Sequence, residues 1–361
     1  MSSRFRYAAA GILLLLALGI HIYSLNAARV EWQYSMGFFP GFAATLRKVF
    51  GGFSTSIGDI VYGLFIVFLL YKLFRFFRWV FRKKRTKVKK DWPASAASFL
   101  IWLAGLYIIF NIFWGINYDR KGIAWQLGLD LVPYQVEDVK SLNAALVQKV
   151  NENRRMLPEL HPAYASDKEL FRQATSAYGE AAKQYPFLKY QPVSLKKSIW
   201  GWVGNYTGFT GYYNPFTGEA QVNTTVPGFL HPFVACHEVA HQLGYAKEME
   251  ANFVGFLAGR SSQNRLMLYS LYLDLFMYAN RNLSFTDSLA ARTLRNGLDT
   301  AVVNDLKTWK KFNLEHKSFA EPIVRFLYGT FLKSNGQPQG ILSYDEVTAF
   351  LIAYRKKFGT L

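Results

Sequence analysis

The sequence predicts three N-terminal transmembrane helices followed by an α+β, mostly helical domain. Three apolar stretches lie within the first 116 of the 361 residues, and each is close to the roughly 20 residues that a helix needs to cross a bilayer. Hydrophobic residues make up 51% of the chain and aromatic residues 17%, which is more than a soluble protein usually carries. We therefore expect a membrane anchor over residues 1–116 and a folded domain over residues 117–361.

The first predicted span covers residues 7–25 and follows Arg4 and Arg6. No Ala-x-Ala site comes after it, which favours an uncleaved anchor over a signal peptide. The second span covers residues 54–73, and the third covers residues 94–116 with no charge inside it.

A strongly basic loop, residues 72–92, separates the second and third spans. Ten Lys and Arg residues and no acid lie between Lys72 and Lys90, so this run supplies most of the formal net charge of +18. Loops that are rich in Lys and Arg stay in the cytoplasm. Because the chain then crosses three times, we expect a multi-pass protein of the cytoplasmic (inner) membrane, in contact with its lipid bilayer, whose large domain is extracytoplasmic.

The charge does not predict nucleic-acid binding. From Ile116 onward the net charge is only about +6. No compact basic patch with interleaved aromatic residues, the pattern typical of nucleic-acid binding, stands out in this part of the sequence. The single cysteine, Cys236, cannot form an intramolecular disulfide, and we expect it to be a small buried helix residue.

Most of the domain is predicted to be helical. Residues 136–156 have helical periodicity, and Ser166 with Glu169 forms a capping-box pattern at the start of a helix that reaches about Gln184. After Pro232 the pattern is helical to the end of the chain. Three tyrosines of this last part are expected to be core aromatics, namely Tyr269, Tyr272 and Tyr278.

One segment has a different character. Residues 206–213 are rich in glycine and strand formers, residues 214–218 read Asn-Pro-Phe-Thr-Gly, and residues 219–223 can form a returning strand. The sequence therefore predicts a β-hairpin between Tyr206 and Asn223.

The chemistry-bearing motif is His237-Glu238-Val239-Ala240-His241. Histidines four apart on a helix share one face and can bind one metal ion. Glu238 can lie beside the open position of that metal and accept a proton from a metal-bound water. The alternative is a polar helix face with two incidental histidines, which would leave these groups half-buried without a purpose.

Two histidines leave one protein ligand to be found. Glu248 is our first candidate, and Asn252, four residues later on the same face, can hydrogen-bond a ligand histidine. Glu250 and a residue elsewhere in the chain remain alternatives. Glu248 can also be explained as a first-turn carboxylate that the helix dipole favours.

The two helices together resemble the gluzincin metallopeptidases, whose second helix usually reads Glu-x-x-x-Asp. Two departures are Asn252 in place of Asp and the short separation of six residues between His241 and Glu248. Nearly the whole chain is similar to an uncharacterised bacterial family of three-span membrane proteins, domain of unknown function 3810. The segments that carry this resemblance are residues 211–220, 237–244, 250–253 and 331–337. The resemblance implies a zincin-like metallopeptidase fold for residues 117–361 but no substrate.

Zincins of this kind resemble one another in an edge strand beside the metal cleft, which an extended substrate can pair with. The hairpin is our candidate for that strand, with Tyr213, Gly218 and Ala220 as candidate substrate-binding residues. A purely structural hairpin is the alternative. Tyr213 and His231 are weaker candidates for stabilising an oxyanion, and His231 is also explained as a loop or capping residue.

The sequence thus predicts a zinc-dependent metallopeptidase that hydrolyses a peptide or protein substrate, with Zn²⁺ on His237, His241 and Glu248 and with Glu238 activating water. One alternative is a non-catalytic metal-binding or interaction protein of the cell envelope. Another is a zinc hydrolase that acts on a non-peptide envelope substrate. An intact Glu238 weighs against the first, since a structural site does not need that carboxylate.

Overall fold

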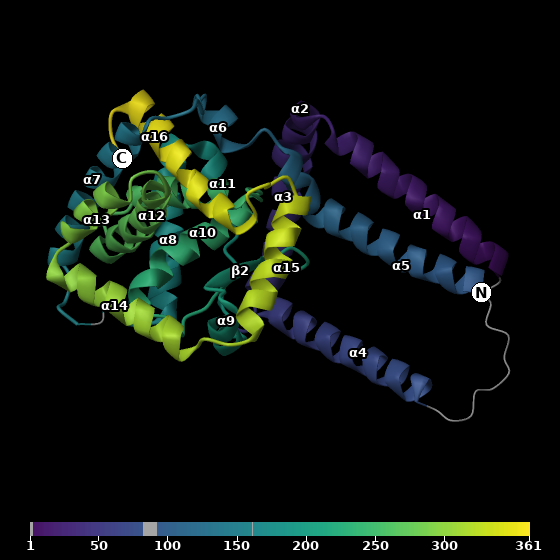
Figure 1. The fold of residues 1–361 in the computed structure, drawn as a ribbon. Helices are drawn as coiled ribbons and strands as arrows, with labels where there is room; N and C mark the ends of the chain where they lie inside the picture. Colours follow the sequence, from purple (N-terminus) through teal and green to yellow (C-terminus); the bar gives the residue numbers. More distant parts are fainter. Residues whose placement is uncertain (1–2, 82–91, 161) are drawn as a thin grey trace.

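The computed structural model describes residues 3–81, 92–160 and 162–361. Three long helices, α1 (Ser3–Ser24), α4 (Ile57–Val80) and α5 (Trp92–Phe113), project from one side of a helical body, with the N-terminus at the far end (Figure 1). All three are long and apolar enough to cross a membrane, as predicted from the sequence.

The second of these helices continues beyond the predicted span of residues 54–73. α4 continues through Lys72 and Arg75 to Val80, so the first part of the expected basic loop is helical. Lys and Arg are good helix formers, and their long stems can lie along an apolar helix while the charges reach water. The rest of that loop, residues 82–91, lies outside the described residues.

Small residues mark the contact between α1 and α5. Ala10 of α1 and Ala94, Ala97 and Ala104 of α5 are buried where the two helices pack together. Small side chains let apolar helices approach closely, which is the usual packing mode in a membrane. None of the described side chains of α4 beyond Asp59 is buried.

The chain between α1 and α4 belongs to the base of the body, a feature for which the sequence analysis made no prediction. It forms α2 (Ala27–Arg29), a π-helix η1 (Val30–Phe38) and α3 (Phe39–Gly51). Its apolar residues Val30, Phe39 and Ala43 form a buried cluster with Trp114 and Tyr118, which follow α5. The anchor and the domain therefore share one core at their junction.

A buried ion pair fixes this junction. Arg120 donates to both carboxylate oxygens of Glu31, at 3.0 and 2.6 Å, and both side chains are almost fully inaccessible. Arg120 also donates to the carbonyl of Gly244, at 3.0 Å. The pair thus joins η1 to the chain that follows α5 and to the helix that carries the histidine motif.

We expect Arg120→Met to lower the free energy of unfolding by about 3–5 kcal/mol, because it leaves the Glu31 carboxylate buried without a counter-charge. Denaturant unfolding of the full chain in detergent, followed by tryptophan fluorescence, measures the loss. The matched control is Arg155→Met, which breaks an ion pair with Asp299 at the surface and should cost far less. Equal losses in the two variants would contradict a structural role for the buried pair.

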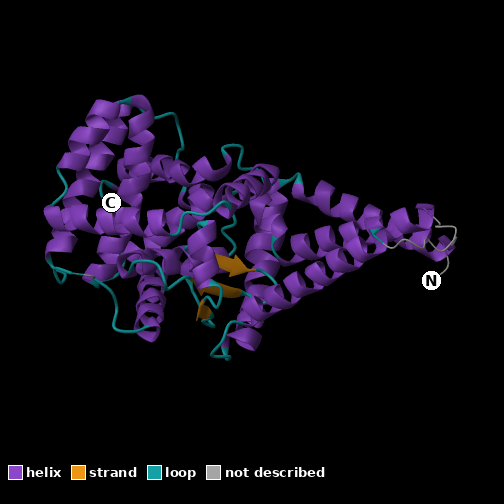
Figure 2. Cartoon of the chain, turned by 60° about the horizontal axis from the view of Figure 1, so that its bottom comes forward, coloured by secondary structure: helices purple, strands orange, loops and turns teal. Residues whose placement is uncertain are grey.

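A small sheet lies where the projecting helices meet the body (Figure 2). The strands β1 (Leu195–Lys197), β2 (Gly211–Asn214) and β3 (Glu219–Val222) have the order β1-β3-β2. β2 and β3 are antiparallel, and β1 is parallel to β3. The predicted hairpin is therefore confirmed, although its first part is wrong: residues 206–207 end the short helix α9 (Gly201–Thr207).

The hairpin turn follows the chemistry of its residues. The Asn214 side chain accepts hydrogen bonds from the backbone N–H groups of Phe216 and Thr217, and Gly218 adopts a φ of +67°. The turn leads into Glu219, whose carboxylate accepts from the backbone N–H groups of Ile57 and Gly58 at the start of α4. The sheet therefore caps one of the projecting helices.

The body consists of helices, as predicted. The remaining elements are η2 (Gly115–Asp119), α6 (Gly122–Leu127), α7 (Val136–Arg155), α8 (Asp167–Gln184), η3 (Pro186–Leu188), η4 (Gly228–Leu230), α10 (His231–Gln242), α11 (Glu248–Arg260), α12 (Arg265–Thr286), α13 (Ser288–Asn296), α14 (Thr300–Glu315), α15 (Ala320–Ser334), η5 (Gly340–Glu346) and α16 (Val347–Phe358). α10 packs against α8, α11, α12 and β3, so the histidine motif lies in the centre of the fold.

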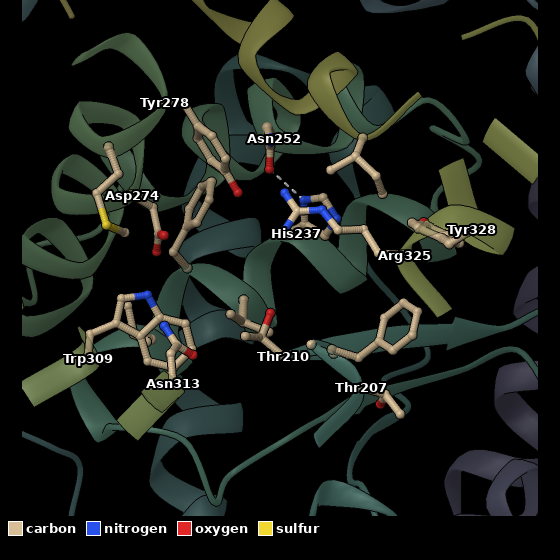
Figure 3. Close-up of a pocket in the computed structure, with 18 of the residues that line it drawn as sticks. Thr207, Thr210, His237, Asn252, Asp274, Tyr278, Trp309, Asn313, Arg325 and Tyr328 are labelled. Atoms are coloured by element: carbon tan, nitrogen blue, oxygen red, sulfur yellow. Dashed lines mark hydrogen bonds between the residues drawn. The ribbon is translucent and has the colours of Figure 1, made fainter. Parts of the chain in front are cut away.

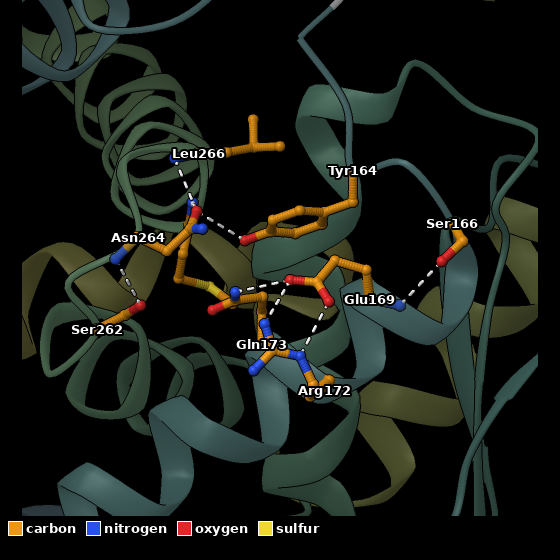
Figure 4. A network of polar contacts seen from close by, with 9 residues as sticks. Tyr164, Ser166, Glu169, Arg172, Gln173, Ser262, Asn264 and Leu266 are labelled. Atoms are coloured by element: carbon orange, nitrogen blue, oxygen red, sulfur yellow. Dashed lines mark hydrogen bonds and ion pairs between the residues drawn. The ribbon is translucent and has the colours of Figure 1, made fainter.

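The start of α8 confirms part of the predicted capping box (Figure 4). The Ser166 hydroxyl accepts a hydrogen bond from the backbone N–H of Glu169, at 3.2 Å. The Glu169 carboxylate does not reach back to the cap. It accepts from Arg172 and Gln173 on its own helix instead, because these donors lie three and four residues further on.

Candidate metal centre

The helix that carries the motif is held at both ends. Pro232 occupies its first turn, where a missing N–H is tolerated, and Gly244 with a φ of +90° follows its last turn. Two buried guanidinium groups meet the C-terminal carbonyls: Arg47 donates to Gln242 at 2.9 Å, and Arg120 donates to Gly244. Positive charge at this end complements the helix dipole and fixes the position of α10.

Three side-chain atoms converge on one point between α10 and α11. His237 Nε2 and His241 Nε2 are 3.1 Å apart, and Glu248 Oε2 is 3.2 Å from the first and 3.6 Å from the second. All three side chains are buried. A tetrahedral zinc ion with bonds of about 2.0–2.1 Å holds its ligand atoms about 3.3–3.4 Å apart, so the three atoms fit such an ion.

The other nitrogen of each imidazole is also engaged. His237 Nδ1 lies 2.7 Å from Asn252 Oδ1, and His241 Nδ1 lies 2.7 Å from the carbonyl oxygen of Tyr245. Because both acceptors need an N–H, they place the proton on Nδ1 and leave Nε2 free to bind a metal. The predicted contact of Asn252 with one of the two motif histidines is confirmed.

The two candidate glutamates point to different places. Glu248 faces the histidines, and the Tyr328 hydroxyl donates to its Oε1. Glu250 packs against Gly122 instead: a Cβ on that glycine would lie 1.7 Å from Glu250 Oε1. Glu248 is therefore the acidic residue that the structure brings to the two histidines.

The carboxylate of Glu238 is buried beside this point. Its Oε2 accepts no hydrogen bond from any described residue. Its Oε1 lies against the start of β2, where a Cβ on Gly211 would approach it to 2.6 Å. Glycine at position 211 therefore leaves the space that the Glu238 carboxylate occupies.

The electrostatics of the site are dominated by burial and by Glu248. Burial raises the pKa of Glu238 to about 7, although both histidines oppose this shift. Burial alone would lower the pKa of His241, but the hydrogen bond and the charge of Glu248 raise it to about 9. Burial alone would raise the pKa of Glu248, and the two histidines instead hold it far below its usual range. The carboxylate of Glu248 thus faces two imidazoles, and a divalent cation can bind all three groups at once.

A cleft of about 490 Å³ opens over the site (Figure 3). His237 and Glu238 of α10 line it together with Thr210 and Gly211 at the start of β2. Much of the remaining wall comes from α12, α14 and α15. Its volume is within the range of small-molecule sites and can hold a few residues of a polymer.

The three predicted substrate-binding residues do not line this cleft. The Tyr213 ring packs on Trp114, with ring centres 4.7 Å apart, in the apolar junction with the projecting helices. Gly218 lies in the hairpin turn against Leu46, and Ala220 is fully buried in the central strand. β2 begins at the cleft and runs away from it, so only its first residue faces the site.

Three other side chains have plain structural explanations. His231 Nε2 contacts the carbonyl of Val226 at 2.8 Å, so this histidine holds a loop, and it does not line the cleft. Cys236 is fully buried, with its sulfur 3.7 Å from that of Met267, as expected for a small core residue. Tyr269 is also buried in the core, as predicted.

The sequence analysis missed residues of the cleft wall. Tyr278, expected in the core, is half-buried and lines the cleft together with Asp274 of the same helix. A signal was present, because Asp274 is the only charged residue between Leu266 and Asn280. An isolated acid in an apolar helix needs a partner or a function.

Two histidines one turn apart and a glutamate from the next helix define a candidate metal centre of the His/His/Glu kind. It lies in a mostly helical protein with three apolar helices that can span a membrane. The model of the family described as "Protein of unknown function (DUF3810)" matches residues 34–352, and the chain belongs to this family. No curated protein and no solved structure shows a significant match to the chain.

Proposed function

We propose that the chain is a membrane-anchored, zinc-dependent metallopeptidase with a zincin-like, gluzincin-type catalytic domain. The observation that carries this proposal is the convergence of His237, His241 and Glu248 beside the carboxylate of Glu238, with His237 and Glu238 lining an open cleft. A purely structural zinc site is usually closed by four protein ligands, and it needs neither the cleft nor a second buried acid beside the ligands.

His237, His241 and Glu248 would hold the zinc ion, which would supply Lewis acidity to the scissile carbonyl and to water. Glu238 is placed to take a proton from the attacking water and to return it to the leaving amine. Its carboxylate is buried beside the convergent ligand atoms and accepts no hydrogen bond from the described residues through Oε2, so it remains available for this proton transfer. Asn252 and the Tyr245 carbonyl keep both imidazoles in the orientation that binds metal.

The edge strand favours a peptide over other envelope substrates. Within the described residues, β2 pairs only with β3, and its first residue, Gly211, lines the cleft beside Glu238. A peptide at this point can form backbone hydrogen bonds with the start of the strand, which a lipid or a glycan cannot reproduce in the same way. A non-peptide zinc hydrolase is the second candidate, and it shares the same metal chemistry.

The test of this function is zinc-dependent cleavage by the purified full-length chain in detergent. We expect about one zinc per chain, hydrolysis of members of a mixed peptide library, loss of cleavage with a chelator and recovery on adding zinc. The full chain is needed because η1 and α3 complete the core beneath the site. A chain that holds zinc but cleaves no peptide, while it hydrolyses a cell-wall or lipid preparation, would favour the second candidate.

We also propose that the body of the protein is extracytoplasmic. The ten basic residues between Lys72 and Lys90 favour a cytoplasmic position for that connection, and the body lies at the opposite ends of α4 and α5 (Figure 1). A periplasmic reporter fused after Gly122 should be active, and a cytoplasm-only reporter at the same point should be inactive. The reverse pattern would overturn the orientation and leave the metal site unaffected.

A further inference from the structure

The wall of the cleft contains a carboxylate without a partner. Asp274 of α12 lines the cleft, and its Oδ2 is inaccessible and accepts no hydrogen bond from any described residue. Burial, with no opposing charge or hydrogen bond, raises the pKa of this side chain to about 8. The nearby Arg281 does not compensate it, because its guanidinium donates to both oxygens of Asp345. The fold therefore keeps, in the wall of an open cleft, an acid for which the described residues supply neither a counter-charge nor a hydrogen bond to Oδ2.

The surroundings of Asp274 suit a compact cation. Trp309 and Asn313 of α14 lie on the same side of His237 as Asp274 does, and Tyr278 lies one turn further along α12 (Figure 3). Aromatic rings beside a carboxylate add cation–π attraction to the charge pairing. The opposite side of the cleft carries Arg325, whose positive charge disfavours a cation there.

The accessibility of the Asp274 carboxylate favours a primary ammonium group over a guanidinium group. A guanidinium binds best through two parallel hydrogen bonds, which need both carboxylate oxygens. Since Oδ2 is inaccessible, only one oxygen of Asp274 can be offered to a ligand. A primary ammonium group, which behaves as a point charge with three donors, matches this arrangement better.

We propose that this end of the cleft is a subsite for a primary ammonium group of the substrate, with Asp274 as its counter-charge and Trp309 beside it. This assignment rests on the proposed function in naming the substrate, which would be a peptide with a lysine-like side chain or a free amino terminus near the cleaved bond. Binding of an ammonium group at this subsite depends on the cleft and on Asp274, and it does not depend on peptidase activity.

The first experiment does not depend on cleavage. The thermal midpoint of the full-length Glu238→Gln chain is measured with n-butylammonium chloride and with sodium chloride of equal concentration. We expect butylammonium to raise the midpoint, and we expect Asp274→Asn to abolish the difference between the two salts. Asp274→Asn should still fold, because it keeps the size of the side chain and breaks no hydrogen bond or ion pair with the described residues. The matched control is Glu321→Gln, which removes another carboxylate of the same cleft and should keep the difference. Equal midpoints in the two salts, or an unchanged difference in Asp274→Asn, would overturn the subsite.

The second experiment distinguishes the sources of the ammonium group. Peptides with a blocked amino terminus and one lysine, arginine or norleucine are compared with lysine-free peptides that have a free amino terminus. We expect the peptide whose ammonium group reaches the subsite to be cleaved about tenfold or more faster than the blocked norleucine peptide. If that group is a side chain, lysine should be ahead of arginine. The preference should vanish in Asp274→Asn. Cleavage of all peptides at similar rates would defeat the subsite but keep the peptidase. A butylammonium effect that needs Asp274, without cleavage of any peptide, would keep the subsite and defeat the peptidase.

Discussion

Replacing Glu238 by glutamine is expected to leave zinc bound and to lower peptide turnover by roughly 10²–10⁴-fold. The substitution keeps the size of the side chain, so it should fit the space that Gly211 leaves for it. The three convergent ligand atoms are untouched. The lost function is proton transfer, because an amide cannot accept the proton of the attacking water at neutral pH.

Zinc content and cleavage rate must be measured on the same purified sample. His237→Ala is the comparison variant, since it removes a ligand and should lose both zinc and activity. A Glu238→Gln chain that holds zinc and cleaves at the wild-type rate would rule out this residue as the general base. A chain that loses zinc would instead give Glu238 a role in holding the metal.

Removing the carboxylate of Glu248 is expected to weaken zinc binding by more than the 10–100-fold that is typical of losing an outer partner of a ligand. Glu248 Oε2 lies within 3.6 Å of both imidazole Nε2 atoms, so Glu248→Ala leaves only two protein ligands. Glu250→Ala should bind zinc as the wild type does, because Glu250 packs against Gly122, away from the histidines.

A competition titration with a coloured chelator measures all the affinities under the same conditions. Asn252→Ala provides an intermediate case, since it removes the acceptor of the His237 Nδ1 proton and should cost about 10–100-fold. A larger loss in Glu250→Ala than in Glu248→Ala would exchange the roles of the two glutamates. Equal affinities in both variants would place the third ligand elsewhere in the chain.

Local features of the molecule could be predicted because their causes lie within a few residues. The spacing of His237 and His241 places both on one face of any helix that contains them. Asn214 and Gly218 specify a turn by their own backbone preferences, and the hairpin formed there. The three apolar helices follow from length and composition, because a helix that crosses a bilayer needs an uninterrupted apolar stretch. α4 continues past the predicted span of residues 54–73, because Lys and Arg are good helix formers even where the apolar stretch has ended.

The choice between Glu248 and Glu250 depended on how two helices pack. Both residues lie in the first turn of α11, and either could have faced α10. The face that α11 presents is set by its close approach to α10 at Gly255, where a Cβ would lie 3.3 Å from the backbone nitrogen of His237. This contact joins residues that are far apart in sequence, so no local pattern records it.

By itself, the sequence determined the two histidines, the acid beside them, the apolar helices and the hairpin. These features depend on short-range geometry and hydrophobicity, which neighbouring residues in the chain set without help from the rest of the fold. Only the tertiary structure decided which residues surround the cleft. β2 advances about 3.3 Å per residue, so Gly211 lies beside Glu238 while Tyr213 reaches the junction with the projecting helices. Asp274, from another helix, faces the same cleft. Such placements depend on how α10, α12, α14 and the sheet pack together, which is a property of the whole fold rather than of any one segment.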